Sequence, residues 1–307
     1  MEEFTVDREK CDWKGSVAKY KGKILTEEDY DIVCSSDKSF RVLGPEGGLW
    51  GQREELAIVV KGVYDDETEI YDVLKNIKLT SDLRTTQSGP VNTNLLEEKG
   101  LVEGEDYKLI NENSYIRKSK SGKWQDVERG NEIHSGMIGY KKNRWTGENT
   151  ITPWCDNNPD EWNILKDIAY INEEVFAKYL PGTHDYQKEW VKAYIKPTDR
   201  IGKTEESSIF TTLSINKYHK DYSVNGMGAH VDPGDVQGGR TTMAVFGEGE
   251  IEGAYFVFPR WGIAVKREHG DVVIADSHEI HGVTPITGGD GSMITCVAYS
   301  DSRLKKK

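Results

Sequence analysis

The sequence is poor in cysteine, and its cysteines are far apart. Four occur among 307 residues, at Cys11, Cys34, Cys155 and Cys296, and no Cys-x-x-Cys pair is present. This usage argues against a disulfide framework and favours free thiols. We therefore expect an intracellular, reducing compartment, either the cytoplasm or the nucleus.

Long hydrophobic runs are also missing. No apolar stretch approaches the length of a membrane span, and the opening Met-Glu-Glu-Phe-Thr lacks the basic-then-apolar order of a signal peptide. We therefore expect no membrane partner. A hydrophobic content of 36% beside a charged content of 30% is typical of a globular protein. The length suffices for a sizeable core in one large domain or two small ones.

The sequence also lacks an excess of positive charge. The net charge is −12 and the pI is about 5.2, which argues against broad, charge-driven binding of nucleic acid. Two local basic clusters could still contact phosphates, and the alternative for both is a solvated loop. They are Arg117-Lys118-Ser119-Lys120 with Lys123, and Lys141-Lys142-Asn143-Arg144-Trp145.

The most informative stretch runs from Ala229 to Thr284. It opens with Ala-His-Val-Asp-Pro-Gly-Asp and closes with His-Glu-Ile-His-Gly-Val-Thr. The apolar runs between these ends are short, rich in β-branched and aromatic residues, and bounded by Gly, Pro and Asp, which predicts strands. These runs are Met243–Phe246, Ala254–Phe258 and Val272–Ala275.

We predict that His230, Asp232 and His281 bind one iron ion. Residues i and i+2 of a strand share a face, so His230 and Asp232 can reach one metal. His281 comes late enough to return on a facing strand. Two imidazoles and one carboxylate leave positions open for substrate and dioxygen, as in non-heme Fe(II) oxygenases. His278 competes with His281, and Asp-Pro-Gly-Asp also fits a plain solvated turn.

At these residues the chain resembles the TET and base J-binding protein dioxygenases. The similarity covers residues 134 to 300, and its His-Gly-Val-Thr-Pro turn favours His281 over His278 as the last ligand. It implies a jelly-roll core, Fe(II), 2-oxoglutarate, O2, and oxidation of the 5-methyl group of a pyrimidine in DNA, either 5-methylcytosine or thymine. The matching segments are Ser207–Lys217, His230–Asp235, Gly270–Val273, His281–Pro285, Gly139-Tyr140, Thr152–Trp154 and Tyr179–Gly182.

The resemblance also predicts residues around the cosubstrate. Asn216 stands where family members have a residue near the cosubstrate, and Asp235 is expected to accept a hydrogen bond from an imidazole or from the cosubstrate. The final strand aligns Thr295 with the family's serine. It aligns Met293 with the arginine that pairs with the distal carboxylate of 2-oxoglutarate.

A methionine cannot replace that arginine, because a thioether forms no bidentate ion pair with a carboxylate. Arg240 and Lys217 are the cations nearest in sequence to the metal motif. We expect Arg240 to meet the carboxylate if 2-oxoglutarate is the cosubstrate. The alternative is ascorbate, which a branch of the family with a similar His-x-Asp-x-x-Asp pattern uses.

Other functions stay open at this point. One is an Fe(II) oxygenase acting on a small molecule or a protein side chain, which the acidic pI favours. Another is a non-catalytic module that binds DNA or a ligand, which the missing arginine favours. A base in duplex DNA would have to be flipped into the pocket, and Trp145, Trp154 and Tyr218 are available to stack on it.

The predicted fold is α+β but mainly β: a double-stranded β-helix (jelly roll, cupin-like) with flanking helices. Residues 205–300 are expected to form two facing sheets, with amphipathic helices over 158–195 on one outer face, where Asn172 caps a second segment. We also expect a strand at Leu56–Val60 and a helix at Thr68–Ile77. The chain divides into an N-terminal region, 1–133, that packs on the core and carries candidate recognition loops, and the core itself, 134–307.

Overall fold

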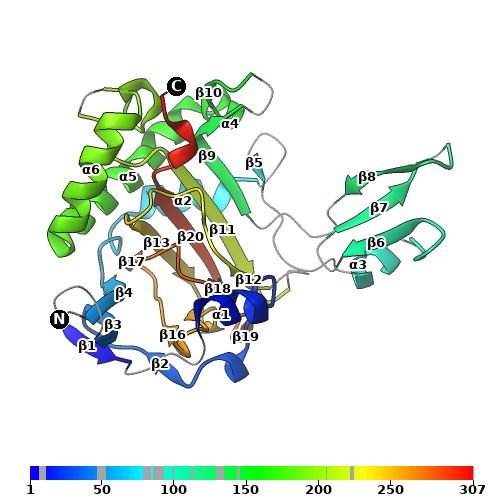
Figure 1. The fold of residues 1–307 in the computed structure, drawn as a ribbon, viewed down its shortest axis with the longest axis horizontal. Helices are drawn as coiled ribbons and strands as arrows, with labels where there is room; N and C mark the ends of the chain where they lie inside the picture. The colour runs from blue at the N-terminus through cyan, green and yellow to red at the C-terminus, as the bar shows by residue number, and fades with distance from the viewer. Residues whose placement is uncertain are drawn as a thin grey trace.

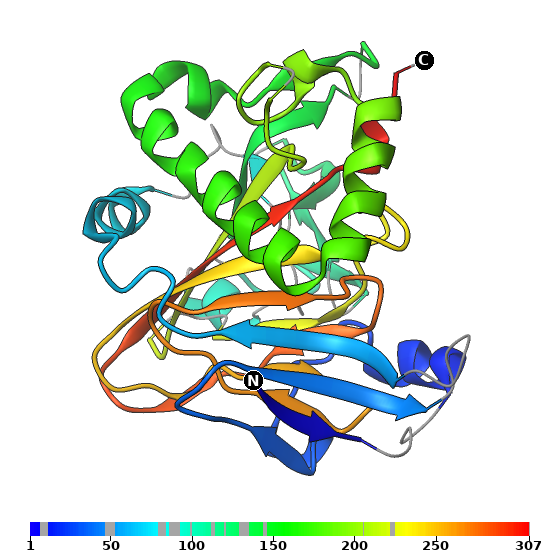
Figure 2. The same ribbon diagram turned by 90° about the vertical axis from the view of Figure 1, so that its left-hand side faces the viewer.

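The computed structural model describes residues 1–6, 12–46, 53–78, 84–85, 93–98, 100–111, 114–119, 121–128, 135–143, 146–204, 206–221 and 225–306. Two facing sheets form the core of this structure (Figures 1 and 2). Nearly all strand pairs are antiparallel, and the exceptions are β1 with β3 and β2 with β16. The predicted double-stranded β-helix is confirmed.

The larger sheet has ten strands. In spatial order these are β1 (Glu2–Thr5), β3 (Phe40–Glu46), β4 (Arg53–Val60), β17 (Val272–Ala275), β13 (Thr241–Glu248), β20 (Ser292–Tyr299), β11 (Thr212–His219), β9 (Ser135–Lys142) and β10 (Asn149–Ile151), with β5 (Arg84–Thr85) paired to β9.

The smaller sheet has five strands and faces the middle of the larger one. Its order is β12 (Met227–His230), β18 (His281–Val283), β15 (Phe256–Phe258), β16 (Ile263–Val265) and β2 (Ile32–Cys34). A two-stranded ribbon of β14 (Glu252–Gly253) and β19 (Ile286–Gly288) completes this half.

Side chains of the larger sheet alternate between its two faces, so every second residue of a strand points into the space between the sheets. Along β13, Met243 and Val245 point inward, whereas Ala244 and Phe246 point to the opposite face. The same alternation runs through the neighbouring strands β17 and β20. Both faces of the larger sheet are therefore buried, one by the smaller sheet and the other by helices.

The helices cover the outer face of the larger sheet, as Figure 2 shows. Helices α5 (Pro159–Tyr179) and α6 (Pro181–Tyr194) lie there beside α2 (Thr68–Asn76) and α4 (Pro153–Asn157). Prolines at the first turn fix the starts of α4, α5 and α6. The remaining helices are α1 (Trp13–Tyr20), which contacts β12, and α3 (Thr93–Glu98).

Two expectations about these helices need correction. Asn172 does not cap a second segment, because α5 runs unbroken through it, and its side chain accepts a hydrogen bond from the buried Tyr64 hydroxyl at 2.8 Å. Pro181 does more than end α5: it opens α6. The strand at Leu56–Val60 and the helix from Thr68 are confirmed, although α2 ends at Asn76.

The N-terminal region contributes to both sheets. Strands β1, β3 and β4 extend the larger sheet beyond β17, and β2 adds an edge to the smaller sheet. A domain boundary at residue 133 stays a prediction. A separate three-stranded sheet of β6 (Tyr107–Asn111), β7 (Ser114–Lys118) and β8 (Trp124–Glu128) projects from the core at the right of Figure 1. Among the described residues, no helix combines the length and apolar character that a membrane crossing requires.

Candidate metal centre

Two adjacent strands of the smaller sheet bring the histidines together. His230 ends β12, His281 begins β18, and the two residues are direct partners in the antiparallel register. Gly282 lets these strands approach closely, since a Cβ at this position would lie 2.8 Å from the Met227 carbonyl oxygen. The imidazole rings consequently lie 4.5 Å apart between centroids.

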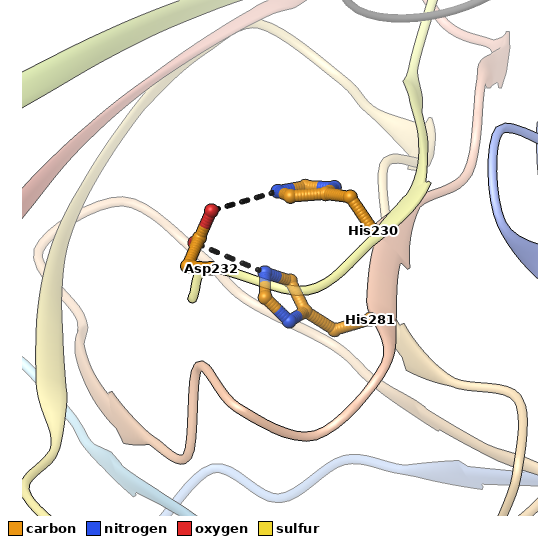
Figure 3. Close-up of side chains that lie close together, drawn as sticks. All are labelled: His230, Asp232 and His281. Carbon is orange, nitrogen blue, oxygen red and sulfur yellow. Dashed lines mark ion pairs between the residues drawn. The ribbon is translucent and has the colours of Figure 1, made fainter. Parts of the chain in front are cut away.

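Asp232 faces both rings from the turn after β12 (Figure 3). One carboxylate oxygen lies 3.8 Å from His230 Nε2, and the other lies 3.7 Å from His281 Nε2. The three potential ligand atoms all lie within 4.8 Å of one another. This spacing and donor set suit one metal ion bound by two imidazoles and a carboxylate.

Backbone carbonyls orient both imidazoles. His230 Nδ1 lies 2.8 Å from the Gly228 oxygen, and His281 Nδ1 lies 2.8 Å from the Glu279 oxygen. A carbonyl only accepts, so each Nδ1 carries the hydrogen and donates it. In this tautomer a ring presents the lone pair of Nε2 toward Asp232, which is the arrangement that metal-binding histidines use.

The environment of His281 keeps its ring neutral. Burial, and then the neighbouring His230, lower the pKa of His281 to about 4, and the charge of Asp232 opposes this only in part. A neutral imidazole is the form that binds metals. His278 is placed differently: its Nδ1 lies 3.4 Å from an Asp276 carboxylate oxygen, and it is not one of the three clustered residues.

The cluster lies at a cavity of about 350 Å³ between the two sheets. The wall opposite the histidines comes from inward-facing residues of β9, β11, β13 and β20. The lining residues are Ser135, Met137, Ser214, Asn216, Tyr218, Met227, His230, Asp232, Pro233, Gly234, Asp235, Thr241, Met243, Phe256, Ser277, His281, Val283, Val297, Tyr299 and Arg303.

Asn216 and Asp235 both line this cavity, and their predicted roles at the cosubstrate stay predictions. Asn216 donates to the Thr295 hydroxyl at 3.3 Å, and its side-chain oxygen has no hydrogen-bond partner. Thr295 lies behind it and does not line the cavity. Asp235 accepts from the Ser277 hydroxyl at 2.5 Å, and burial followed by the charge of Asp232 raises the pKa of Asp235.

The two cations proposed from the sequence have other partners. Arg240 lies 3.4 Å from an Asp276 carboxylate oxygen, donates to the Gly239 and Glu55 carbonyls, and does not line the cavity. Lys217 points to the outer face and donates to carbonyls at the end of α2. The role of Arg240 at the cosubstrate is therefore still an untested prediction, and its geometry does not favour it.

Two arginines near the cavity were not anticipated from the sequence. Arg303 lines the mouth and makes a bidentate pair with Asp301, at 2.6 and 2.8 Å. Arg267 is fully enclosed behind Met243, a lining residue. Its signal in the sequence is weak: a basic residue two positions after the apolar run Ile263–Val265, where inward alternation continues past the strand.

The three aromatic residues considered for base stacking fall in different places. Tyr218 is in the cavity wall. Trp154 is buried in the helical layer, so it serves packing. Trp145 lies outside the described residues, as do Lys120 and Arg144 of the basic clusters, whereas Lys118 and Lys123 are exposed on the projecting sheet.

No family model matches the chain. In sequence it is similar to thymine dioxygenase JBP1 of Leishmania infantum, with 35% identity over 99 residues, 31% of this chain and 11% of that protein. It is also similar to thymine dioxygenase JBP1 of Leishmania tarentolae, with 34% identity over 177 residues, 55% of this chain and 20% of that protein. The matched segments thus span a fifth or less of these relatives' length.

Among solved structures the chain is similar to NgTET1 in complex with 5mC DNA. The TM-score is 0.53 and the identity 12%, and the match covers 90% of this chain and 84% of that one. This likeness concerns the fold. The chain is thus similar to thymine dioxygenase JBP1 over part of its sequence, and to a TET protein in its fold.

Proposed function

We propose that this protein is an Fe(II)-dependent dioxygenase that oxidises the 5-methyl group of a pyrimidine in DNA with 2-oxoglutarate and O2. The observation that carries the proposal is the convergence of two imidazole Nε2 atoms and one carboxylate at a cavity between two sheets. The names of the relatives, thymine dioxygenase and a TET protein with 5mC DNA, indicate the substrate class.

The residues present fit an iron ion. His230, Asp232 and His281 would hold it as three protein ligands on one side, which leaves coordination positions toward the cavity. When bound, Fe(II) would supply the redox chemistry that inserts one oxygen atom of O2 into a methyl C–H bond, with 2-oxoglutarate converted to succinate and CO2.

The side chains and backbone of the protein would bind and orient the metal and the substrates, and would exclude water from the site. The Gly228 and Glu279 carbonyls hold the histidine rings in the tautomer that presents Nε2. The carboxylate of Asp232 is 45% exposed, so the ligand cluster opens toward entering molecules. The unsatisfied oxygen of Asn216 offers an acceptor on the opposite wall, within a volume typical of small-molecule sites.

The projecting sheet offers a surface for DNA on an otherwise acidic protein. Trp124 is 36% exposed, and the ammonium groups of Lys108 and Lys118 lie 4.6 and 5.6 Å from its ring. An aromatic ring flanked by cations suits stacking on a base together with phosphate contact. We assign this surface to binding of the DNA duplex, while the target base is flipped out of the duplex into the cavity.

The test is DNA-dependent turnover. Purified protein with Fe(II) and O2 is expected to release succinate from 2-oxoglutarate faster with 5-methylcytosine or thymine DNA than with uracil DNA that lacks methyl groups. Equal succinate release with all DNAs would favour a small-molecule or protein substrate. Turnover with ascorbate but not 2-oxoglutarate would identify the other cosubstrate, and the absence of turnover with both would favour a binding module.

A further inference from the structure

Arg267 is a buried cation that lacks an anionic partner in the described structure. Its residue is 3% exposed. One terminal nitrogen donates to the Met243 sulfur at 2.9 Å, and the other donates to the Ala254 carbonyl at 2.6 Å. Its Nε has no hydrogen-bond partner, and no described carboxylate lies within ion-pair distance.

Burying a guanidinium without a counter-ion lowers the free energy of unfolding, unless a bound anion pairs with it. A thioether is a weak acceptor, and a buried ion that lacks a counter-ion destabilises the fold. Burial lowers the pKa of Arg267 to about 10, so the guanidinium stays charged at neutral pH. Among the described residues, no carboxylate therefore forms an ion pair with this charge inside the β-helix, and Asp271 acts on it only from a longer distance.

This charge lies next to the metal-site cavity. Arg267 contacts Met243 and lies 5.7 Å from the centre of the Phe256 ring, and both of these residues line the cavity. The other neighbour of that ring is His281, at 5.2 Å between centroids. One aromatic side chain, Phe256, thus lies against both the guanidinium and a histidine of the metal centre.

Met293 belongs to the same inward-facing cluster. It pairs with Tyr218 in the β11–β20 register, and it packs in one apolar group with Met243 and Phe256. The side chains of Met243 and Met293 therefore occupy the end of the barrel at which the distal carboxylate of a cosubstrate is expected, and Arg267 stands behind them.

We propose that Arg267 meets the distal carboxylate of 2-oxoglutarate, in place of the arginine that the family resemblance predicts at the position of Met293 on the last strand. The inference rests on the proposed function and names a residue for it. The flexible thioether of Met243 covers the guanidinium fork. On binding it turns aside, and a carboxylate takes the Nε and terminal N–H donors in a bidentate pair.

A purely structural role for Arg267 makes an opposite prediction about stability. If the side chain serves only to hold the Ala254 carbonyl, its loss should lower the melting temperature. If it is kept for an anionic ligand, Arg267→Met removes an uncompensated charge from an apolar site. The variant should then melt at the same temperature as the parent protein or higher, as for residues that trade stability for function.

The direct experiment is calorimetric titration of 2-oxoglutarate into the full chain loaded with Mn(II), without O2. Arg267→Met is expected to weaken binding on the order of 10- to 100-fold, the loss typical of charge-assisted hydrogen bonds. Arg267→Lys keeps the charge but not the planar fork, so an intermediate loss is expected. The matched control is Arg41→Met, an arginine paired with Glu55 outside the cavity, which should bind normally.

A rescue variant makes the assignment specific. Adding Met293→Arg to Arg267→Met returns a guanidinium to the last strand, and we expect it to recover at least part of the lost affinity. If Arg267→Met does not fold, the Arg267→Lys titration and its thermal shift with 2-oxoglutarate carry the test.

The outcomes separate this inference from the proposed function. Unchanged affinity in Arg267→Met, with normal binding by the parent protein, overturns the inference alone. A loss of affinity in Arg240→Met but not in Arg267→Met transfers the role to Arg240 and also overturns it. If the parent protein loaded with metal does not bind 2-oxoglutarate, both the cosubstrate proposal and this inference fail.

Discussion

Replacing Asp232 by alanine separates metal binding from folding. The carboxylate is 45% exposed, and its oxygens lie 3.7 and 3.8 Å from the two histidine nitrogens. Such partly exposed pairs contribute about 0–1 kcal/mol to folding. The core between the two sheets does not depend on the Asp232 carboxylate. The free energy of unfolding of Asp232→Ala, measured in urea, should therefore lie within about 1 kcal/mol of the parent protein's.

The same substitution should abolish the metal site, because it removes one of three protein ligands. Even changes in residues that only support a ligand cost 10- to 100-fold in metal affinity. We expect Asp232→Ala to lose more than about 100-fold, measured by calorimetry with Mn(II). His278→Ala is the matched control, since this histidine is in the same segment but pairs with Asp276. Retained metal affinity in Asp232→Ala, or loss in His278→Ala, would refute the assignment.

Three further predictions concern the DNA surface, the core and the response to pH. Trp124→Ala should weaken binding of methylated duplex DNA several-fold and leave 2-oxoglutarate affinity unchanged, and equal DNA binding across a salt series would contradict the assigned surface. Phe246→Ala should lower the free energy of unfolding by about 3–5 kcal/mol in urea, since the ring is fully buried and stacks on Tyr71; a loss below 1 kcal/mol would argue against this packing. Burial lowers the pKa of Lys217 to about 8 from 10.5, so the unfolded chain binds more protons between these values, and this residue should add stability as pH rises from 8 to 10.5. Thermal melts of the parent protein and Lys217→Met should diverge over this window, and parallel curves would exclude the effect.

The clustering of the three candidate ligands could be anticipated from their spacing. His230 and Asp232 are two residues apart, which would put both on one face of a strand. The strand β12 instead ends at His230, and Asp232 reaches the same site from the turn that follows. The choice of His281 over His278 came from a turn motif, and the register of β12 with β18 places His281 opposite His230. Asn216 was named from the family resemblance alone, and the structure places it in the cavity wall.

Helix boundaries within 158–195 were harder to predict, because a polar residue can either cap a helix or accept a buried hydrogen bond inside one. Asn172 resembles a cap in the sequence, yet inside α5 its side-chain oxygen accepts a hydrogen bond from a buried tyrosine hydroxyl 108 residues away in the chain. No local pattern contains that partner. In the same way, the sequence predicts a strand at Leu56–Val60, and only long-range pairing of β4 with β3 and β17 shows that it belongs to the core sheet.

Closeness in sequence to the metal motif does not place an arginine beside the cavity. Arg240 follows the metal strand closely, but Asp276 supplies a nearby partner that draws it away from the cavity. Arg267 lies farther along the chain, and the fold turns it inward behind Met243. Which arginines lie next to the cavity depends on how the two sheets pack, and no local sequence pattern contains that information.

The central claim is best tested by mass spectrometry of nucleosides from DNA treated with the protein, Fe(II), O2 and 2-oxoglutarate. Duplexes carrying 5-methylcytosine or thymine are supplied separately, and parallel reactions contain ascorbate alone or the His281→Ala variant. We predict a hydroxymethyl pyrimidine that requires 2-oxoglutarate and an intact His281. The absence of any oxidised pyrimidine under every condition, or an equal yield from the His281→Ala variant, would contradict the account.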